Sequence, residues 1–426
     1  MVKFGKIFLI LVLFSHCGKK TSSFPEVRIN APNPGDSFEF SEWIQIKATL
    51  QHEDLRAYRV SLISETESAQ FFVRDGMAQG ESFELRVSIQ LDNTNMPSGK
   101  YRVRVTAFTE DNQASAERSM TYIRKPLETD GLWIVSDNGN FYDLGILPFT
   151  RSPIWHSGLI GQKVMATSVM EPNIIITAPQ FLANARMYSG ETGDFLYSIT
   201  RQEQTSFPYF TSLNGYNNRY VISNYLGFTE VREASGTMLH NIELEENIIS
   251  RMSAFGHEFY FMQTENILNS NIREWVVYNR LGTRFGERLT QDSAVAAFSI
   301  SSNLWWVLYN NANGAGFDRF TAGTGAREPF IGQMSGRAIT GIQLSANRYI
   351  LATTQGVFEV RTQQSGIIHL SNLGIPIYLA YDPIQNRLAV LKNGQIDEYN
   401  LTNMQMIRSV PVPSNTKYVG YTYKRE

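Results

Sequence analysis

The most regular feature of the chain is the alternation of apolar and polar residues in short runs. In WIQIKATL (residues 43–50), apolar side chains occupy every second position. The same period of two occurs in AYRVSLIS (57–64), SFELRVSIQL (82–91) and KYRVRVTAF (100–108). Successive side chains of a strand point to opposite faces of a sheet, so this period predicts strands with one buried and one wet face. Several such strands within about 100 residues predict a β-sandwich over residues 26–125.

A second pattern fills the rest of the chain. From about Asp130 the sequence repeats one element, which is an apolar strand, a turn, a second strand and a polar or glycine turn, as in RYVISNYLGFTEVREASG. The anchors of the second strand recur about every 43 residues, at Tyr142, Tyr188, Val231, Tyr278, Phe320, Val360 and Tyr399. This is the period of a four-stranded propeller blade. One blade cannot bury both of its faces, but seven arranged radially can, so we expect a seven-bladed β-propeller over residues 130–426.

The C-terminus supplies a strand that the first repeat lacks. Each later repeat has an apolar strand just upstream, whereas the junction RKPLETD precedes LWIVS in the first repeat. The segment YVGYTY (418–423) matches the missing strand. We therefore predict that it forms the inner strand of the blade that contains Trp133 and Tyr142. Such pairing would close the ring and remove two open edges.

The N-terminus predicts export. Lys3 and Lys6 precede an apolar run from Ile7 to Phe14, which has the length of a secretory h-region and is too short to span a bilayer. The segment FSHC, which ends in Cys17, resembles the lipobox of bacterial lipoproteins. The resemblance implies that residues 1–16 form a signal peptide, that Cys17 is the lipidation site and that residues 17–25 form a tether. An ordinary secretory signal with an incidental cysteine is the alternative.

The same resemblance implies a location. Residue 18, which follows the cysteine, is Gly rather than Asp. In lipoproteins of two-membrane bacteria this favours the outer membrane. We therefore expect the protein in the bacterial cell envelope, attached to a membrane through acyl chains that each contribute roughly 0.8 kcal/mol per buried CH₂ group.

Two stretches resemble known β-domain families. PSGKYRVRVTAFTEDNQ resembles the penultimate strand of bacterial immunoglobulin-like domains. LAYDPIQNRLAVLKNGQIDEYNLTN resembles blades of the YVTN and quinoprotein-like propellers. The sequence has no recurrent Trp-Asp pair, which argues against a strict WD40 repeat. The resemblances imply an all-β chain, in which an immunoglobulin-like β-sandwich (26–125) is followed by a seven-bladed β-propeller closed by the C-terminal strand.

Charge and cysteine content restrict the partners. The chain has 38 Lys and Arg against 40 Asp and Glu, for a formal net charge of −2. Removing residues 1–16 also removes Lys3 and Lys6, so the mature charge is about −4. A nucleic-acid-binding protein would show a basic patch or stripe, so we expect no nucleic-acid partner. With a single cysteine, no disulfide can form within the chain.

Motifs for catalysis are missing from the sequence. The five histidines after residue 16 have no metal-binding spacing, and no G-x-S-x-G elbow occurs. The stretch DNGN (137–140) superficially resembles a calcium loop, but an Asn-Gly pair between two strands favours a hairpin turn. Trp305 and Trp306 could stack on a sugar, but adjacent strand residues face opposite sides, and in a propeller both faces of a blade pack on neighbours, which favours core packing. We expect no catalytic residue, metal or cofactor.

Candidate ligand contacts come from the three longest segments that do not follow the repeat pattern, which are residues 151–162, 201–210 and 263–274. Exposed loops on a rigid scaffold often carry function. Trp155, His156, Asn271 and Arg273 are the candidates, and tolerated loop insertion is the alternative.

We interpret the protein as a non-enzymatic binding or scaffold module for a protein or glycan. The alternative is an exported propeller enzyme, either a glycan lyase or hydrolase, whose paired carboxylates could come from different blades, or a quinoprotein-like oxidoreductase.

Overall fold

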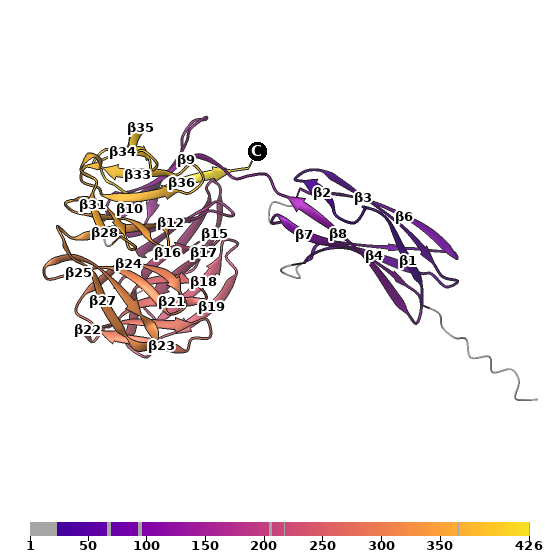
Figure 1. The fold of residues 1–426 in the computed structure, drawn as a ribbon, viewed down its shortest axis with the longest axis horizontal. Coiled ribbons are helices and arrows are strands. Elements are labelled where there is room, and N and C mark those ends of the chain that lie inside the picture. The colour runs from indigo at the N-terminus through magenta and orange to yellow at the C-terminus, as the bar shows by residue number, and fades with distance from the viewer. Residues whose placement is uncertain are drawn as a thin grey trace, which may run out of the picture. The chain divides into compact units, whose positions relative to one another are not determined.

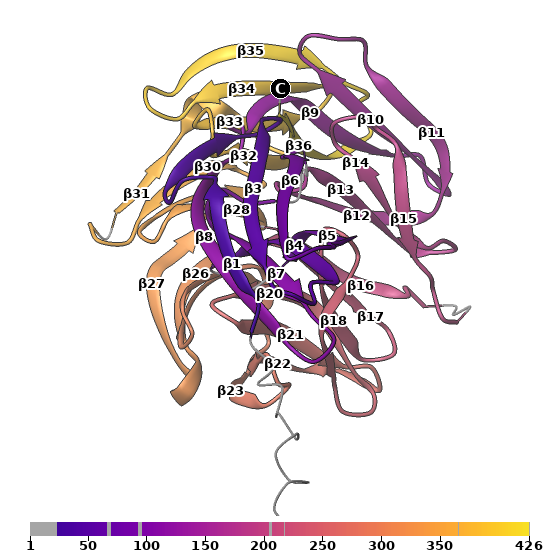
Figure 2. The ribbon, with the colours of Figure 1, turned by 90° about the vertical axis from the view of Figure 1, so that its right-hand side faces the viewer.

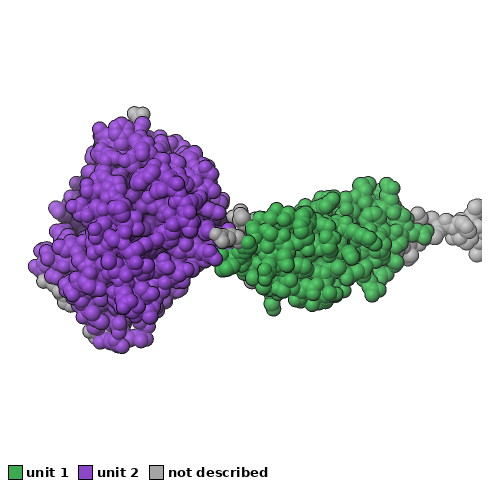
Figure 3. Space-filling model, turned by 90° about the horizontal axis from the view of Figure 1, so that it is seen from above, with its two compact units in different colours: residues 1–126 green, residues 127–426 purple. Residues whose placement is uncertain are grey.

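The computed structural model describes residues 24–65, 70–92, 96–203, 207–216, 218–364 and 366–425. These residues form β-strands and two single-turn 3₁₀ helices, η1 (Ala322–Thr324) and η2 (Ser371–Leu373), so the predicted all-β class is confirmed. The chain divides into two compact units, which we call unit 1 (Met1–Pro126) and unit 2 (Leu127–Glu426) (Figure 3). Each unit is described by itself.

Unit 1 consists of two sheets in its described residues. The first has the order β1-β3-β6, with β1 (Glu26–Ala31), β3 (Trp43–Gln51) and β6 (Ser82–Gln90). The second has the order β2-β8-β7-β4-β5, with β2 (Asp36–Glu39), β8 (Gln113–Ile123), β7 (Gly99–Phe108), β4 (Ala57–Ser64) and β5 (Gln70–Met77). Neighbouring strands are antiparallel, except that β2 runs parallel to β8.

The core of unit 1 follows the alternation in the sequence. Ile44, Ile46, Ala48 and Leu50 of β3 are all completely buried, while the residues between them are more exposed. The inward residues of β6 and β7 complete the same apolar cluster. The period-two prediction is therefore confirmed for these strands. In β4 the residues from Val60 to Ser64 are all buried, because this strand lies inside the larger sheet.

Unit 2 consists of seven four-stranded sheets in its described residues, which we number from the N-terminus (Figure 1). Sheet 1 contains β36 (Thr416–Lys424), β9 (Glu128–Asp137), β10 (Phe141–Pro148) and β11 (Ile154–Ile160). Sheet 2 contains β12 (Gln162–Val169), β13 (Ile174–Phe181), β14 (Ala185–Ser189) and β15 (Phe195–Ile199). Sheet 3 contains β16 (Phe210–Tyr216), β17 (Arg219–Asn224), β18 (Phe228–Glu233) and β19 (Met238–Glu243).

The remaining four sheets repeat the same order. Sheet 4 contains β20 (Ile248–Gly256), β21 (Phe259–Asn266), β22 (Asn269–Asn279) and β23 (Arg284–Leu289). Sheet 5 contains β24 (Ser293–Ser301), β25 (Leu304–Asn311), β26 (Gly314–Thr321) and β27 (Ala326–Met334). Sheet 6 contains β28 (Ala338–Ser345), β29 (Arg348–Thr353), β30 (Gly356–Arg361) and β31 (Gly366–His369). Sheet 7 contains β32 (Tyr378–Asp382), β33 (Arg387–Lys392), β34 (Gln395–Asn400) and β35 (Gln405–Pro411).

The first strands of the seven sheets form a closed ring. Contacts run from β36 to β12 and then through β16, β20, β24, β28 and β32 back to β36. Each sheet therefore packs its faces on two neighbours, and its first strand lines the axis (Figure 2). This radial arrangement of four-stranded antiparallel sheets is a β-propeller.

The ring is closed by the C-terminal strand. β36 pairs with β9 in an antiparallel ladder in which Val419 lies opposite Ile134 and Tyr421 opposite Leu132 (Figure 2). The pairing predicted for residues 418–423 is therefore confirmed. Gly420 lies opposite Trp133, and a Cβ atom at this position would approach the indole ring to 2.3 Å. A glycine thus allows the terminal strand to pass over the tryptophan.

The interpretation of the adjacent tryptophans as core residues is also confirmed. Trp305 is completely buried between sheets 4 and 5, where its ring centroid lies 5.7 Å from that of Phe261. Trp306 points to the other face of β25 and stacks on Phe317 at 5.2 Å, within the core shared with sheet 6. DNGN likewise forms the hairpin turn between β9 and β10, with Gly139 at a φ of 84°.

The antiparallel order gives the ring two distinct ends. In each sheet, the hairpin between the second and third strands lies at the same end as the connection to the next sheet. We call this the connection end, and residues 267–268 between β21 and β22 lie there. Hairpins between first and second strands, and between third and fourth strands, lie at the opposite end, which we call the far end.

Candidate functional site

A channel of about 850 Å³ follows the axis of unit 2. All seven first strands contribute to its wall, through side chains that include Thr167, Asn214, Ser253, Ser299, Gln343, Tyr381 and Tyr418. The wall contains hydroxyl, amide, aromatic and apolar groups. Among the described residues that line the channel, Arg251 carries the one charged side chain. Such a wall can both donate and accept hydrogen bonds and can stack on a flat ligand.

Arg251 belongs to a three-residue ion cluster near the connection end. Its Nη2 atom donates to Oε1 of Glu265 at 3.0 Å, and Nε of Arg273 donates to Oε2 of the same carboxylate at 3.1 Å. The Glu265 side chain is only 8 % exposed, whereas those of Arg251 and Arg273 are 42 % and 33 % exposed. Two guanidinium groups thus share one buried carboxylate, and the cluster carries an excess positive charge at the channel wall.

Two tyrosines provide an aromatic element in the same channel. Tyr378 of β32 and Tyr418 of β36 meet edge to face, with ring centroids 5.1 Å apart. Burial raises the pKa of both phenols above the ordinary value. Both hydroxyls therefore stay protonated at neutral pH and remain able to donate a hydrogen bond.

Four buried hydroxyl groups connect the channel wall with the interior of sheet 3. Ser212 and Ser253, on neighbouring first strands, lie 2.6 Å apart, and Ser223 lies 2.9 Å from Ser212. Thr229 continues the chain at 2.9 Å from Ser223. Each hydroxyl can donate one bond and accept two, so the cluster satisfies its own groups. Sequence reasoning missed it because single serines in separate strands carry no spacing signal.

The structure places the four candidate contacts in strands, not in loops. Asn271 and Arg273 lie in β22, because residues 263–274 form the two arms of a long hairpin with a two-residue tip. Trp155 and His156 lie in β11, so most of the segment 151–162 is the outer strand of sheet 1. The expectation that these two segments are loops was wrong, although Trp155 and Asn271 are exposed. The roles of these residues as ligand contacts stay predictions.

Trp155 and His156 have structural partners in sheets 1 and 2. The indole of Trp155 covers Gly145 on the neighbouring strand β10, where an added Cβ would come within 2.6 Å of the ring. His156 contacts the carbonyl oxygen of Gly193 through Nε2 at 2.7 Å, and its ring lies 5.1 Å from that of Tyr188. Both residues lie just after the β10–β11 turn, which is at the far end. They are therefore separated from Arg273, the one candidate that joins the channel cluster.

Three further results concern the other predicted sites. Cys17 and the whole signal segment lie outside the described residues. Within the described ranges, no group of three or more His, Cys, Asp and Glu side chains is arranged to hold a metal ion. In that same part of the chain, no helix has the length and apolar character needed to cross a bilayer.

Comparisons with known proteins give structural similarity only. No protein-family model matches the chain, and no curated protein matches its sequence. The computationally designed protein Ika8 is 13 % identical over 70 % of this chain and 97 % of its own, with a TM-score of 0.44. A quinoprotein alcohol dehydrogenase-like protein from Bacteroides thetaiotaomicron is 10 % identical, with coverages of 93 % and 99 % and a TM-score of 0.41. BamB from Moraxella catarrhalis is 11 % identical, with coverages of 60 % and 79 % and a TM-score of 0.37.

Proposed function

We propose that the protein is an exported, lipid-anchored, non-enzymatic binding module of the bacterial outer membrane. In this proposal Cys17 carries the lipid, unit 1 is an immunoglobulin-like spacer, and unit 2 is a seven-bladed propeller that binds a protein or glycan. The seven four-stranded sheets and their closed contact ring support the blade count. The hydroxyl of Tyr101, near the start of β7, donates to the carbonyl oxygen of Pro97 at 2.6 Å, which resembles the tyrosine corner of immunoglobulin domains.

The composition of the channel wall is the observation that carries the binding role. Glycoside hydrolysis and general acid–base catalysis use titratable side chains, most often paired carboxylates. The described channel lining instead offers hydroxyls, amides and aromatic rings around a single arginine. These groups recognise a ligand by hydrogen bonding, stacking and one charge, so the geometry favours binding over hydrolysis.

Arg251 provides the test of this binding role. We expect the mature chain to recover a partner from detergent-solubilised membranes, and Arg251→Gln to reduce the recovery at least about fivefold. Arg219→Gln is the control, because Arg219 also forms an ion pair, with Glu258, but does not line the channel. Equal recovery by both variants, measured by quantitative mass spectrometry, would contradict the channel site.

The lipid anchor is tested separately. We expect Cys17→Ser to move the protein from the membrane fraction to the soluble exported fraction, because acyl chains would no longer be attached. Mass spectrometry of the wild-type mature N-terminus should show an acylated cysteine at residue 17. An unmodified N-terminus that starts elsewhere would disprove the anchor without affecting the channel prediction.

A further inference from the structure

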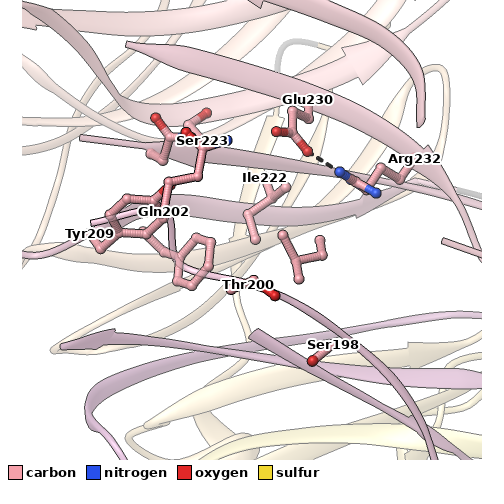
Figure 4. A pocket seen from close by; sticks show the side chains of 11 residues that line it. Ser198, Thr200, Gln202, Tyr209, Ile222, Ser223, Glu230 and Arg232 are labelled. Carbon is pink, nitrogen blue, oxygen red and sulfur yellow. Dashed lines mark hydrogen bonds and ion pairs between the residues drawn. The ribbon is translucent and has the colours of Figure 1, made fainter. Parts of the chain in front are cut away.

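A second cavity, of about 190 Å³, lies between sheets 2 and 3 and is separate from the channel (Figure 4). Ser198 and Thr200 form one side, at and just beyond the end of β15, while Ile222 of β17 and Glu230 of β18 form the other. Tyr209 and Phe210 add aromatic surface, with their rings edge to face at 4.9 Å. The cavity is thus bounded by polar groups on two sheets and by two aromatic rings.

The polar groups of this cavity retain free hydrogen-bonding capacity. Among the described residues, Ser198, Thr200 and Gln202 have no side-chain hydrogen bond. Glu230 accepts a bond from Nε of Arg232 at 2.7 Å through Oε2, while its Oε1 atom has no partner in the described chain. The two side chains are 15 % and 21 % exposed, and Figure 4 shows their ion pair beside the cavity.

Sheet 6 contains the same sequence in the same place, and there the carboxylate has two cationic partners. Glu230-Val231-Arg232 of β18 corresponds in register to Glu359-Val360-Arg361 of β30. Glu359 accepts bonds from Arg361 Nε at 2.6 Å and from Arg348 Nε at 2.9 Å. In sheet 3, Tyr220 occupies the register position that Arg348 has in sheet 6, and its hydroxyl lies 3.3 Å from that of Tyr197. Glu230 therefore lacks a second cation.

The chemistry of the cavity selects the class of ligand. The ion pair of Glu230 and Arg232 has no net charge. A charged ligand would therefore lose its hydration in the cavity without finding an opposite charge that is free to pair with it. A neutral polyol avoids this cost. Its hydroxyls can donate to Glu230 Oε1 and accept from Gln202 and from the serine and threonine hydroxyls, while a ring C–H face packs on an aromatic side chain.

We propose that this cavity binds one neutral sugar residue, as the free end of a glycan. The site has the size of a single sugar ring and contains paired donors and acceptors at its wall. The inference is independent of the proposed channel site, because the two cavities share no residue in their described linings. It would stand if the Arg251 experiment failed, and it would fail without affecting that experiment.

The test uses ligand-observed NMR with the mature chain and methyl glycosides of neutral hexoses and N-acetylhexosamines. We expect at least one glycoside to bind with a millimolar dissociation constant. Thr200→Phe, which fills the cavity from an exposed position, should weaken binding at least about tenfold. Glu230→Gln should weaken it as well, since it removes the charged acceptor. Glu359→Gln is the matched control in sheet 6 and should leave binding unchanged.

Three outcomes would overturn the proposal. One is that no neutral glycoside binds. Another is that a glycoside binds equally to wild type and to Thr200→Phe, since the sugar would then lie elsewhere. The third is that Glu359→Gln weakens binding as much as Glu230→Gln, which would indicate a general effect of losing a buried carboxylate. Because Thr200 is exposed, the first variant tests the site even if Glu230→Gln does not fold.

Discussion

The two units both bury apolar sheet faces, but their strands pair over different distances along the chain. In unit 2, six of the seven described sheets are built from four consecutive strands. Only sheet 1 combines distant segments, because β36 pairs with β9 and Thr416 meets Ser136 across 280 residues. In unit 1, by contrast, both sheets mix early and late strands, as in β1-β3-β6 and β2-β8-β7-β4-β5.

This difference determines where each unit is vulnerable. Local pairing lets each sheet of unit 2 form from neighbouring residues, at a low cost in loop closure. The price is that the ring depends on a single long-range ladder for its closure. In unit 1 the long-range pairings are distributed over several strands, so no single terminal segment has the same importance. The comparison predicts a large effect of removing β36, confined to unit 2.

The largest expected effect is therefore that of deleting residues 417–426. The deletion unpairs a row of backbone groups on β9 and exposes the faces of sheets 2 and 7 that pack on β36. Each buried unpaired group costs about 1–3 kcal/mol, and a folded domain has only ~5–15 kcal/mol of stability. We expect unit 2 to unfold or aggregate. Limited proteolysis should still yield a resistant fragment of unit 1.

A matched control separates the strand from the terminus itself. A chain that ends at Lys424 retains all of β36 and loses the ion pair of Arg425 with Glu171. This variant should remain soluble with a nearly unchanged melting temperature. If the longer deletion also melted at the parental temperature, the closed ring would not be needed for stability, and the proposed count of seven blades would lose its physical basis.

The sequence carried enough information for the architecture because strands and repeats are local patterns. The alternation in WIQIKATL specified the buried face of β3, and the recurrence of the anchors near 43 residues indicated the sheets of unit 2. The unmatched first repeat located the closing strand. Trp305 and Trp306 were assigned to the core because adjacent strand residues face opposite sides and because a propeller blade packs both of its faces on neighbours.

The candidate sites were less predictable because they are assembled across sheets. The channel wall takes several residues from each of seven first strands that are spaced along the whole unit, so no local motif marks it. Residues 151–162 are among the longest segments that depart from the repeat pattern, and β11 was therefore expected to be a loop. The Glu-Val-Arg sequence occurs in sheets 3 and 6, but only the structure distinguishes Tyr220 from Arg348 as the residue beside the carboxylate.

A smaller loss of stability is expected from removing one buried cation of unit 2. This loss again compares unit 2 with unit 1. Arg327 forms ion pairs with Asp318 and Asp292, and its guanidinium lies 4.2 Å from the ring centroid of Tyr309 and 4.7 Å from that of Trp275. Burial alone would lower the pKa of Arg327, but the hydrogen bonds that its guanidinium donates to both carboxylates raise it above the ordinary value. The cation is therefore held between sheets 4 and 5 by charge as well as by stacking.

We expect Arg327→Leu to destabilise unit 2 by about 3–5 kcal/mol, because the completely buried Asp318 would lose its counter-ion. Arg59→Leu is the control in unit 1, where the pair with Asp75 is about half exposed on both sides and should contribute nothing measurable. Urea unfolding followed by tryptophan fluorescence distinguishes the units, since Trp43 is exposed while Trp133, Trp275, Trp305 and Trp306 are buried in unit 2. Equal midpoints for Arg327→Leu and Arg59→Leu would show that the ion network between the sheets adds no stability, and that apolar packing alone holds neighbouring sheets of the ring together.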